Sequence, residues 1–333
     1  LNVGVEPCVR LHGAIRRIRG LPLTADDTKR MLYSLLSEEQ VVKLEKNFSL
    51  DFSYTITGVA RFRVNVFREL RGYKGVFRLV PMELPTLEGV SMAAMFRRLC
   101  HLKQGLVLVT GPTGMGKSTT LAAMINEINS SEQKHIITIE DPVEFLHPHR
   151  MSIISQRELS VHAHSFAAAL RDALREDPNV ILVGEMRDLD TVALAVTAAE
   201  TGHLVFSTLH TASAGQSINR IVDVFPPGQQ EQARQQLSNS LQAIVSQRLL
   251  PAVAGGRVLA LEVMMNTPAI ANLIRDGKTE QLYTVMQVSH ESGMVTLDAH
   301  LTQLVQTGVI TKATGLEYCL DRKSFQATLK SFV

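Results

Sequence analysis

A complete phosphate-binding loop constrains the fold of this chain more than any other feature. Residues 111–118 read Gly-Pro-Thr-Gly-Met-Gly-Lys-Ser, which matches the pattern G-x-x-x-x-G-K-[ST]. The apolar run 106–109 precedes the loop and predicts a buried parallel strand, and residues 118–125 follow it with helical character. A strand, a glycine-rich loop and a helix together aim several backbone N–H groups at one phosphate chain. The chain is therefore predicted to bind a nucleotide.

The residue types of this loop have distinct predicted roles. Glycines let the backbone curl around phosphates with positive φ and with no Cβ in the way. Lys117 is predicted to reach the β- and γ-phosphates, and the Ser118 hydroxyl to ligate Mg²⁺. The predicted nucleotide-binding residues of the loop and the start of its helix are Gly111, Pro112, Thr113, Gly114, Met115, Gly116, Lys117, Ser118 and Thr119.

Composition narrows the class of protein. A length of 333 residues allows two domains, and a formal net charge of +2 gives no bulk electrostatic case for nucleic acid or an anionic membrane as the main partner. Cys8, Cys100 and Cys319 are odd in number and widely spaced, which predicts neither a disulfide framework nor a metal site and fits a reducing cytoplasm. No apolar run approaches the length of a membrane span, and no signal peptide opens the chain.

Residues 1–80 predict a small α+β domain. Its strand 60–67 alternates apolar residues with Arg61, Arg63 and Asn65, so one face is expected to be apolar and the other cationic. The predicted elements are strands within 9–18 around His12 and Gly13, a helical stretch over 26–47, a hairpin of strands 50–56 and 60–67 that turns at Thr57 and Gly58, and a strand over 76–80.

The two-proline segment 81–86 predicts a linker, and we place a linker and connecting helix over residues 81–104. From 105 to the end of the chain the pattern alternates strands with helices, which predicts an α/β domain with a parallel sheet covered by helices. The tail from about Gln229 is predicted to be mostly helical, with a turn at Gly255 and Gly256. The predicted elements before it are strands 106–109, 135–139, 180–183 and 204–208 and helices from 117, over 166–175 and over 191–200.

Carboxylates follow two of these strands at the sheet edge where ligands bind in open α/β sheets. Glu140, Asp141 and Glu144 follow strand 135–139, and Glu185 lies just beyond strand 180–183. A carboxylate in that place can reach Mg²⁺ or orient an attacking water, so Glu185 is predicted to be the main catalytic residue and a metal ligand, with Glu144 as its helper. Taken alone, each acid could instead be a solvated loop residue.

Two histidines bracket the strand over 204–208. A polar group at a strand end could sense the γ-phosphate, which makes His203 and His210 candidate site residues. The alternative is that either histidine is a structural residue whose ring is satisfied by its neighbours. The pairs His147/His149 and His162/His164 have no accompanying carboxylate or cysteine framework and are interpreted as loop residues.

The first domain is rich in arginine. Phosphoryl transfer spreads negative charge over the γ-oxygens, and an arginine from a neighbouring subunit can stabilise that charge. For any single arginine, an exposed cationic sheet face is the simpler interpretation. The candidates are Arg61, Arg63, Arg68, Arg71 and Arg78.

These segments together resemble the secretion-type hexameric ATPases and, within them, the type IV pilus retraction ATPases. The resemblance covers nearly the whole chain, although the start is expected to lack about one strand and one helix relative to the family. Residue 271 is alanine where the family's C-terminal motif usually has arginine, which leaves open a primary retraction motor or an accessory paralogue. The matching segments are Walker A over 111–118, an Asp box over 137–144, an atypical Walker B over 181–188, a His box over 201–210, an N-terminal signature over 60–65 and a C-terminal motif over 269–275.

The resemblance implies a PAS-like N-terminal domain followed by a RecA-like P-loop ATPase domain in a homohexamer. It implies that ATP and Mg²⁺ bind between the two domains, that His203 and His210 belong to the site, and that Arg63 and Arg78 complete it. The implied partner is the pilus platform protein at the cytoplasmic face of the inner membrane, where the ATPase is peripheral and not inserted. No direct contact with nucleic acid is implied.

Three alternatives remain. A pilus-extension or type II secretion ATPase usually carries a four-cysteine zinc element, and this chain has three cysteines in total. A RecA-like nucleic-acid motor predicts basic or aromatic channel loops, whereas this chain has no tryptophan and nearly balanced charge. A nucleotide-binding scaffold without hydrolysis would need the catalytic acid to be lost, yet Glu144 and Glu185 are both in place.

Overall fold

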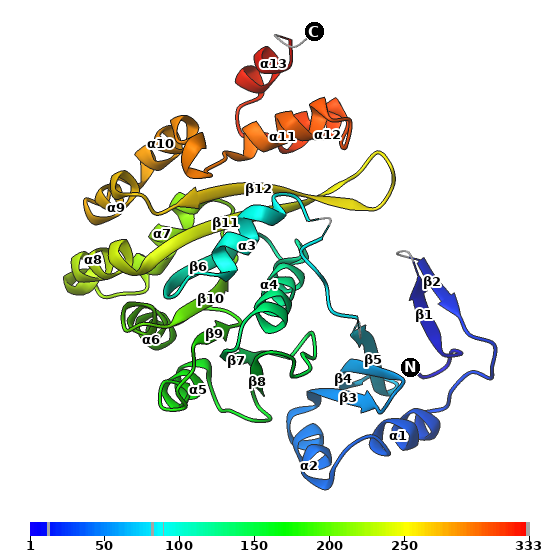
Figure 1. The fold of residues 1–333 in the computed structure, drawn as a ribbon. Coiled ribbons are helices and arrows are strands. Elements are labelled where there is room, and N and C mark those ends of the chain that lie inside the picture. Colours follow the sequence, from blue (N-terminus) through cyan, green and yellow to red (C-terminus); the bar gives the residue numbers. More distant parts are fainter. Residues whose placement is uncertain (12–13, 81–82, 89, 331–333) are drawn as a thin grey trace. The chain divides into compact units, whose positions relative to one another are not determined.

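The computed structural model describes residues 1–11, 14–80, 83–88 and 90–330 (Figure 1). Contacts along the chain divide it into two compact units, Leu1–Glu83 and Leu84–Val333. The division falls inside the predicted linker over 81–104, of which residues 81, 82 and 89 lie outside the described residues.

An antiparallel three-stranded sheet forms the centre of the first unit. Strands β3 (Ser49–Ile56), β4 (Ala60–Glu69) and β5 (Gly72–Val80) pair in chain order, so the predicted hairpin is confirmed. Along β4, Val64 and Val66 are buried while the alternate residues are partly exposed. The predicted division of this strand into an apolar and a cationic face is therefore confirmed.

The helical stretch predicted over 26–47 is two helices, α1 (Ala25–Tyr33) and α2 (Glu38–Asn47). The break occurs at Ser37, whose Oγ accepts a hydrogen bond from the Gln40 N–H at 3.3 Å while the Gln40 side chain accepts one from the Ser37 N–H at 3.0 Å. This reciprocal cap begins a new helix within an otherwise continuous apolar pattern. Strands β1 (Cys8–Leu11) and β2 (Ala14–Arg17) form a further hairpin, and the predicted centre of that segment, residues 12 and 13, lies outside the described residues.

The second unit is built on a seven-stranded sheet, ordered β12-β11-β6-β10-β9-β7-β8. Six strands run parallel and β12 is an antiparallel edge strand, which confirms the predicted mixed α/β class with a large parallel sheet. The strands are β6 (Gly105–Thr110), β7 (His135–Glu140), β8 (Ile153–Glu158), β9 (Val180–Val183), β10 (Leu204–Leu209), β11 (Leu241–Pro251) and β12 (Arg257–Met265). The helices between them are α4 (Lys117–Ser131), α5 (Phe166–Ala173), α6 (Leu189–Glu200), α7 (Ala214–Asp223) and α8 (Gln230–Ser240), with the 3-10 turn η1 (Pro227–Gln229).

The prediction of a mostly helical tail from Gln229 is wrong for residues 241–265. These residues form β11 and β12, and the turn predicted at Gly255 and Gly256 joins the two strands of a hairpin. Leu241, Ile244 and Val245 are spaced as on one face of a helix, but β11 lies between β12 and β6 in the sheet and is buried on both faces. Such a strand lacks the polar and apolar alternation that distinguishes strands from helices in a sequence.

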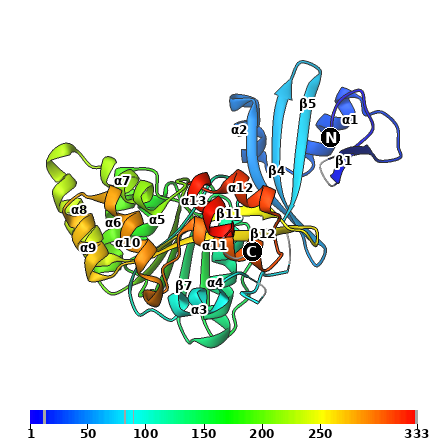
Figure 2. The same cartoon turned by 90° about the horizontal axis from the view of Figure 1, so that it is seen from above.

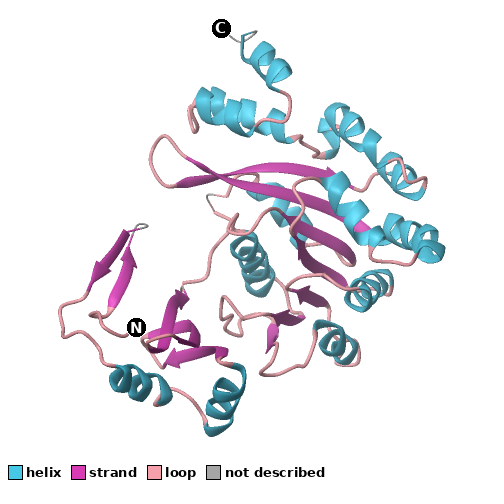
Figure 3. Cartoon of the chain, turned by 180° about the vertical axis from the view of Figure 1, so that it is seen from behind, coloured by secondary structure: helices cyan, strands magenta, loops and turns pink. Residues whose placement is uncertain are grey.

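Helices cover both faces of this sheet (Figure 3). Successive residues of β6 show the division, because Leu106 and Leu108 pack with α5, α6, α7 and α8 whereas Val107 and Val109 pack with α4. All six residues of β6 are buried. The sheet edge that carries the phosphate-binding loop is thus held rigidly between two apolar layers.

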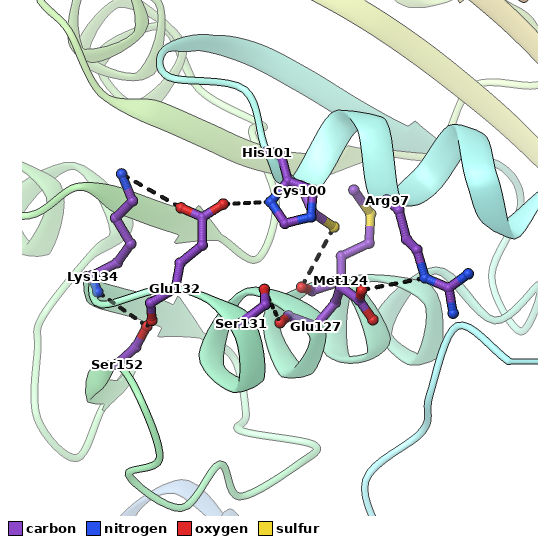
Figure 4. A network of polar contacts seen from close by, with 9 residues as sticks. All are labelled: Arg97, Cys100, His101, Met124, Glu127, Ser131, Glu132, Lys134 and Ser152. Atoms are coloured by element: carbon purple, nitrogen blue, oxygen red, sulfur yellow. Dashed lines mark hydrogen bonds and ion pairs between the residues drawn. The ribbon is translucent and has the colours of Figure 1, made fainter.

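Helix α3 (Ala93–Cys100) packs on α4 through apolar and polar contacts (Figure 4). Arg97 Nε lies 3.3 Å from Glu127 Oε1, His101 Nδ1 contacts Glu132 Oε1, and Cys100 Sγ donates to the Met124 carbonyl. Because α4 begins at the phosphate-binding loop, α3 is fastened to the helix that carries the loop.

Helices α11 (Leu297–Gln306), α12 (Lys312–Tyr318) and α13 (Arg322–Lys330) lie along the β11–β12 hairpin (Figure 2). Leu250 and Ala260 of the hairpin pack with Leu301 and Phe325 of these helices. Among the described residues, no helix is both long and apolar enough to cross a membrane. The other helices after β12 are α9 (Pro268–Arg275) and α10 (Leu282–Val288), with 3-10 turns η2 (Thr279–Gln281) and η3 (His290–Ser292).

Candidate functional site

The loop between β6 and α4 has the geometry of a phosphate cradle. Gly111 has φ +142° and Gly116 has φ +82°, conformations that side chains disfavour. A Cβ on Gly111 would also lie 2.4 Å from the backbone oxygen of Gln247 on β11. Glycine at 111 is therefore required both by its own backbone angle and by the close approach of a neighbouring strand.

Helix α4 begins directly at the end of this loop. Its N-cap residue is Gly116, which makes no side-chain capping bond, and Ser118 and Thr119 lie in its first turn. The first N–H groups of a helix have no partner within the helix, and its dipole favours an anion there. The N-terminus of this fifteen-residue helix is therefore suited to bind a phosphate.

Lys117 is the buried cation of the loop, with only 8% of its surface exposed. Its Nζ donates hydrogen bonds to the carbonyl oxygens of Gly111 at 2.7 Å and of Pro112 at 3.2 Å. Burial lowers the pKa of the Lys117 ammonium, and the carboxylates of Glu185 and Glu144 oppose that effect by raising it. Both predicted catalytic acids therefore act electrostatically on the lysine of the loop.

Glu185 lies just past the carboxyl end of β9 and joins a chain of polar contacts. Its Oε2 lies 2.7 Å from Arg187 Nε and 3.5 Å from His210 Nε2. The other ring nitrogen of His210 lies 3.4 Å from Thr113 Oγ1 in the phosphate-binding loop. The structure thus connects the predicted catalytic acid to the loop through a histidine at the end of β10.

Glu140 and Glu144, at the end of β7 and just beyond it, differ in their surroundings. Glu140 accepts hydrogen bonds from Thr138 Oγ1 at 2.7 Å and from Gln156 Nε2 at 3.2 Å, and burial raises the pKa of its carboxyl group. Glu144, by contrast, is exposed, and its negative charge raises the pKa of Lys117. Of the two, Glu144 has the freedom to serve as a helper to Glu185.

The structure separates His203 from the loop. Leu204, which follows it, pairs with Gly105 at the start of β6, whereas Leu209 pairs with Thr110 beside the loop, so about 17 Å of strand lies between the two ends. The His203 ring bonds to the Ala198 carbonyl at 3.0 Å. Within one chain His203 does not reach the site to which it was assigned, and its geometry is that of a structural residue.

The two candidate arginines are neighbours on the first unit. Arg63 on β4 and Arg78 on β5 occupy directly paired positions of the sheet, and Arg78 is exposed. Directly paired residues project from the same face of an antiparallel sheet, so the two guanidinium groups share one face. Their assignment to a nucleotide stays a prediction.

Sequence reasoning missed the residue that braces the loop from β11. Gln247, only 1% exposed, donates from Nε2 to the Met115 carbonyl at 2.5 Å and accepts the Thr120 hydroxyl at Oε1 at 3.0 Å. Nothing in the sequence marks a glutamine 132 residues beyond Met115 as a neighbour of the loop. Only the order of strands, with β11 beside β6, brings them together.

Comparisons of the chain with a family model and with known proteins agree on one family. Residues 51–314 match the family described as type II/IV secretion system protein. The chain is 48% identical over 317 residues to the type IV pilus retraction ATPase PilT of Pseudomonas aeruginosa, covering 95% of this chain and 92% of that relative. A twitching motility protein of Neisseria gonorrhoeae is 50% identical over 305 residues, covering 91% of this chain and 82% of that relative.

A solved structure extends the likeness to three dimensions. The crystal structure of the pilus retraction motor PilT with bound ADP aligns with a TM-score of 0.91 at 48% identity, covering 98% of this chain and 94% of that one. The match therefore spans both units of the chain.

Proposed function

The chain belongs to the type II/IV secretion system protein family, and on that premise we propose that it is a motor ATPase that couples hydrolysis of Mg-ATP to type IV pilus retraction. The observation that carries the proposal is the meeting of Lys117, Glu185 and His210 at one edge of the parallel sheet. The similarity to a pilus retraction ATPase and to a twitching motility protein supports the retraction role.

The chemistry follows from the positions of these groups. The N–H groups of the loop and the Lys117 ammonium hold the β- and γ-phosphates of ATP. The Glu185 carboxylate orients a water molecule toward the γ-phosphorus and accepts its proton, while His210 lies within reach of both that carboxylate and the loop. Arg187, 2.7 Å from Glu185, fixes the carboxylate in place.

The residues present also fit a magnesium ion. Mg²⁺ is usually held by one or two protein oxygens together with substrate phosphates and water, and the Ser118 hydroxyl lies in the first helical turn where those phosphates would be. The Glu185 carboxylate, just past β9, would be the second protein ligand. A bound ion would neutralise negative charge that develops on the phosphate oxygens during hydrolysis.

We further propose that the chain works as a homohexamer. In this arrangement the paired arginines Arg63 and Arg78 complete a nucleotide site, where their charge stabilises the transferring phosphoryl group. The partner would be the pilus platform protein at the cytoplasmic face of the inner membrane. The segment over 269–275 that resembles the retraction motif forms most of α9, anchored by the buried Ile270 and Ile274.

Magnesium dependence provides a direct test of the hydrolysis step. Release of phosphate from ATP by the purified chain is expected to fall at least about tenfold when EDTA removes divalent ions, because charge on the phosphate oxygens is then left uncompensated. Addition of Mg²⁺ in excess over EDTA should restore the rate. A rate that EDTA leaves unchanged would contradict the proposed role of Ser118.

The retraction role is tested in the organism that encodes the chain. Cells that lack the gene are expected to carry more surface pili than wild-type cells and to lose twitching, because assembled pili are no longer withdrawn. Electron microscopy of the pili and a surface-motility assay measure the two outcomes, with restoration of the gene as the control. Cells without pili would instead indicate an extension ATPase.

A further inference from the structure

The side chain of Gln247 forms a buried bridge between β11 and the phosphate-binding loop. Its amide nitrogen donates to the Met115 carbonyl at 2.5 Å, and its amide oxygen accepts the Thr120 hydroxyl at 3.0 Å. The carbonyl at 115 can only accept and thereby defines which end of the amide faces it. Both polar ends of the buried amide are therefore used within the loop and the first turns of α4.

Fixing the Met115 carbonyl also fixes the direction of the next N–H group. The peptide between Met115 and Gly116 is trans, since among the described residues the cis peptide bond is Asp141–Pro142. In a trans peptide the C=O and N–H bonds point in opposite directions across one rigid plane. A carbonyl held against Gln247 on β11 therefore turns the Gly116 N–H away from that side chain.

The backbone of β11 adds contacts to the same loop. The Gln247 carbonyl oxygen occupies the space that a Cβ on Gly111 would need, and the Leu249 N–H lies 3.2 Å from Met115 Sδ. At the preceding position the Thr110 hydroxyl donates to Ser246 Oγ at 2.9 Å. The last residue of β6 and two residues of the loop thus contact one strand.

We propose that Gln247 is a positioning residue of the nucleotide site, which aims the Gly116 N–H at the phosphates by anchoring the Met115 carbonyl. The inference rests on the proposed function, because it assumes that the loop binds a nucleotide. An amide is suited to this place because it donates and accepts at once, whereas a hydrocarbon or a thioether could not donate to the carbonyl.

The test compares three variants by ADP affinity, by kcat and KM for ATP, and by thermal midpoint. Gln247→Leu and Gln247→Met both free the Met115 carbonyl without adding a charge, and each is expected to weaken ADP binding and raise KM roughly tenfold, with kcat within about threefold of wild type. Thr120→Val is the matched control, because it removes the other bond of the amide and leaves the Met115 anchor. It is expected to lower the thermal midpoint while KM changes by less than about twofold.

Unchanged ADP affinity and KM in the Gln247 variants would overturn the inference, as would equal effects of Thr120→Val and Gln247→Met on KM. If Gln247→Leu does not fold, Gln247→Met, which has an unbranched side chain of similar length, decides. The proposed function fails separately, because a wild-type chain that binds ADP without hydrolysing ATP would leave the affinity comparison intact.

Discussion

Replacement of Glu185 by glutamine is expected to reduce kcat for ATP hydrolysis by about 10²–10⁴-fold, which corresponds to roughly 3–5 kcal/mol of transition-state stabilisation. Glutamine keeps the size of the side chain and its oxygen acceptor for Arg187, 2.7 Å away in the wild type. It loses the negative charge and the ability to accept a proton from water. The change therefore removes the chemical step while it spares the shape of the site.

Nucleotide binding should survive the same substitution. Lys117 and the loop N–H groups hold the phosphates, and removal of a carboxylate near them relieves repulsion with the triphosphate. ATP affinity is therefore expected to equal or exceed that of the wild type. Single-turnover phosphate release and binding of a fluorescent nucleotide measure the two effects separately.

Asp190→Asn is the matched control for Glu185→Gln. It makes the same change of charge five residues further on, at an exposed position in the first turn of α6. Its rate is expected to stay within about twofold of wild type, because exposed charges contribute little at a distance. Equal rates of ATP hydrolysis in Glu185→Gln and wild type would contradict the catalytic role of Glu185. If only Glu144→Gln caused a large loss of rate, Glu144 would be the catalytic acid instead.

Local patterns were sufficient to predict most of the site. The loop over 111–118, the strand ends before Glu185 and His210, and the turn of the first hairpin are each encoded within a dozen residues. Parallel strands bring their carboxyl ends to one edge, so the strand ends alone predicted that these groups would gather. The same rule separates His203 from them, because it precedes β10 and the site lies beyond its other end.

The contribution of β11 could not be predicted in this way. Its apolar residues fit a helical spacing, and the β-branched pair Ile244 and Val245 was the sole local indication of a strand. If this segment were a helix, as its spacing predicts, the sequence would give no reason to place Gln247 beside Gly111 and Met115. The order of strands in a sheet is set by long-range packing, and this order places β11 beside the phosphate-binding loop.

The close approach of β11 predicts a large effect when alanine replaces a glycine of the loop, although this change adds only a methyl group. Gly111→Ala is expected to lower the free energy of unfolding of the second unit by roughly 3 kcal/mol, since the new Cβ would lie 2.4 Å from the Gln247 carbonyl oxygen and the backbone angle is unfavourable. The thermal midpoint should fall by roughly 6–12 °C. Because relief of the clash must move either the loop or β11, nucleotide affinity is expected to fall by about a hundredfold or more.

Gly114→Ala separates the clash from the strain of the backbone. Gly114 has φ +82°, but a Cβ there would meet no atom within 4 Å. Its substitution is therefore expected to cost only the conformational strain, about 1 kcal/mol, and to lower the thermal midpoint by a few degrees. Differential scanning calorimetry of both variants without nucleotide gives the comparison. Equal losses would mean that the contact with β11 adds no cost at 111, whereas a clearly larger loss in Gly111→Ala is the result expected when the Gln247 carbonyl oxygen of β11 opposes the new Cβ.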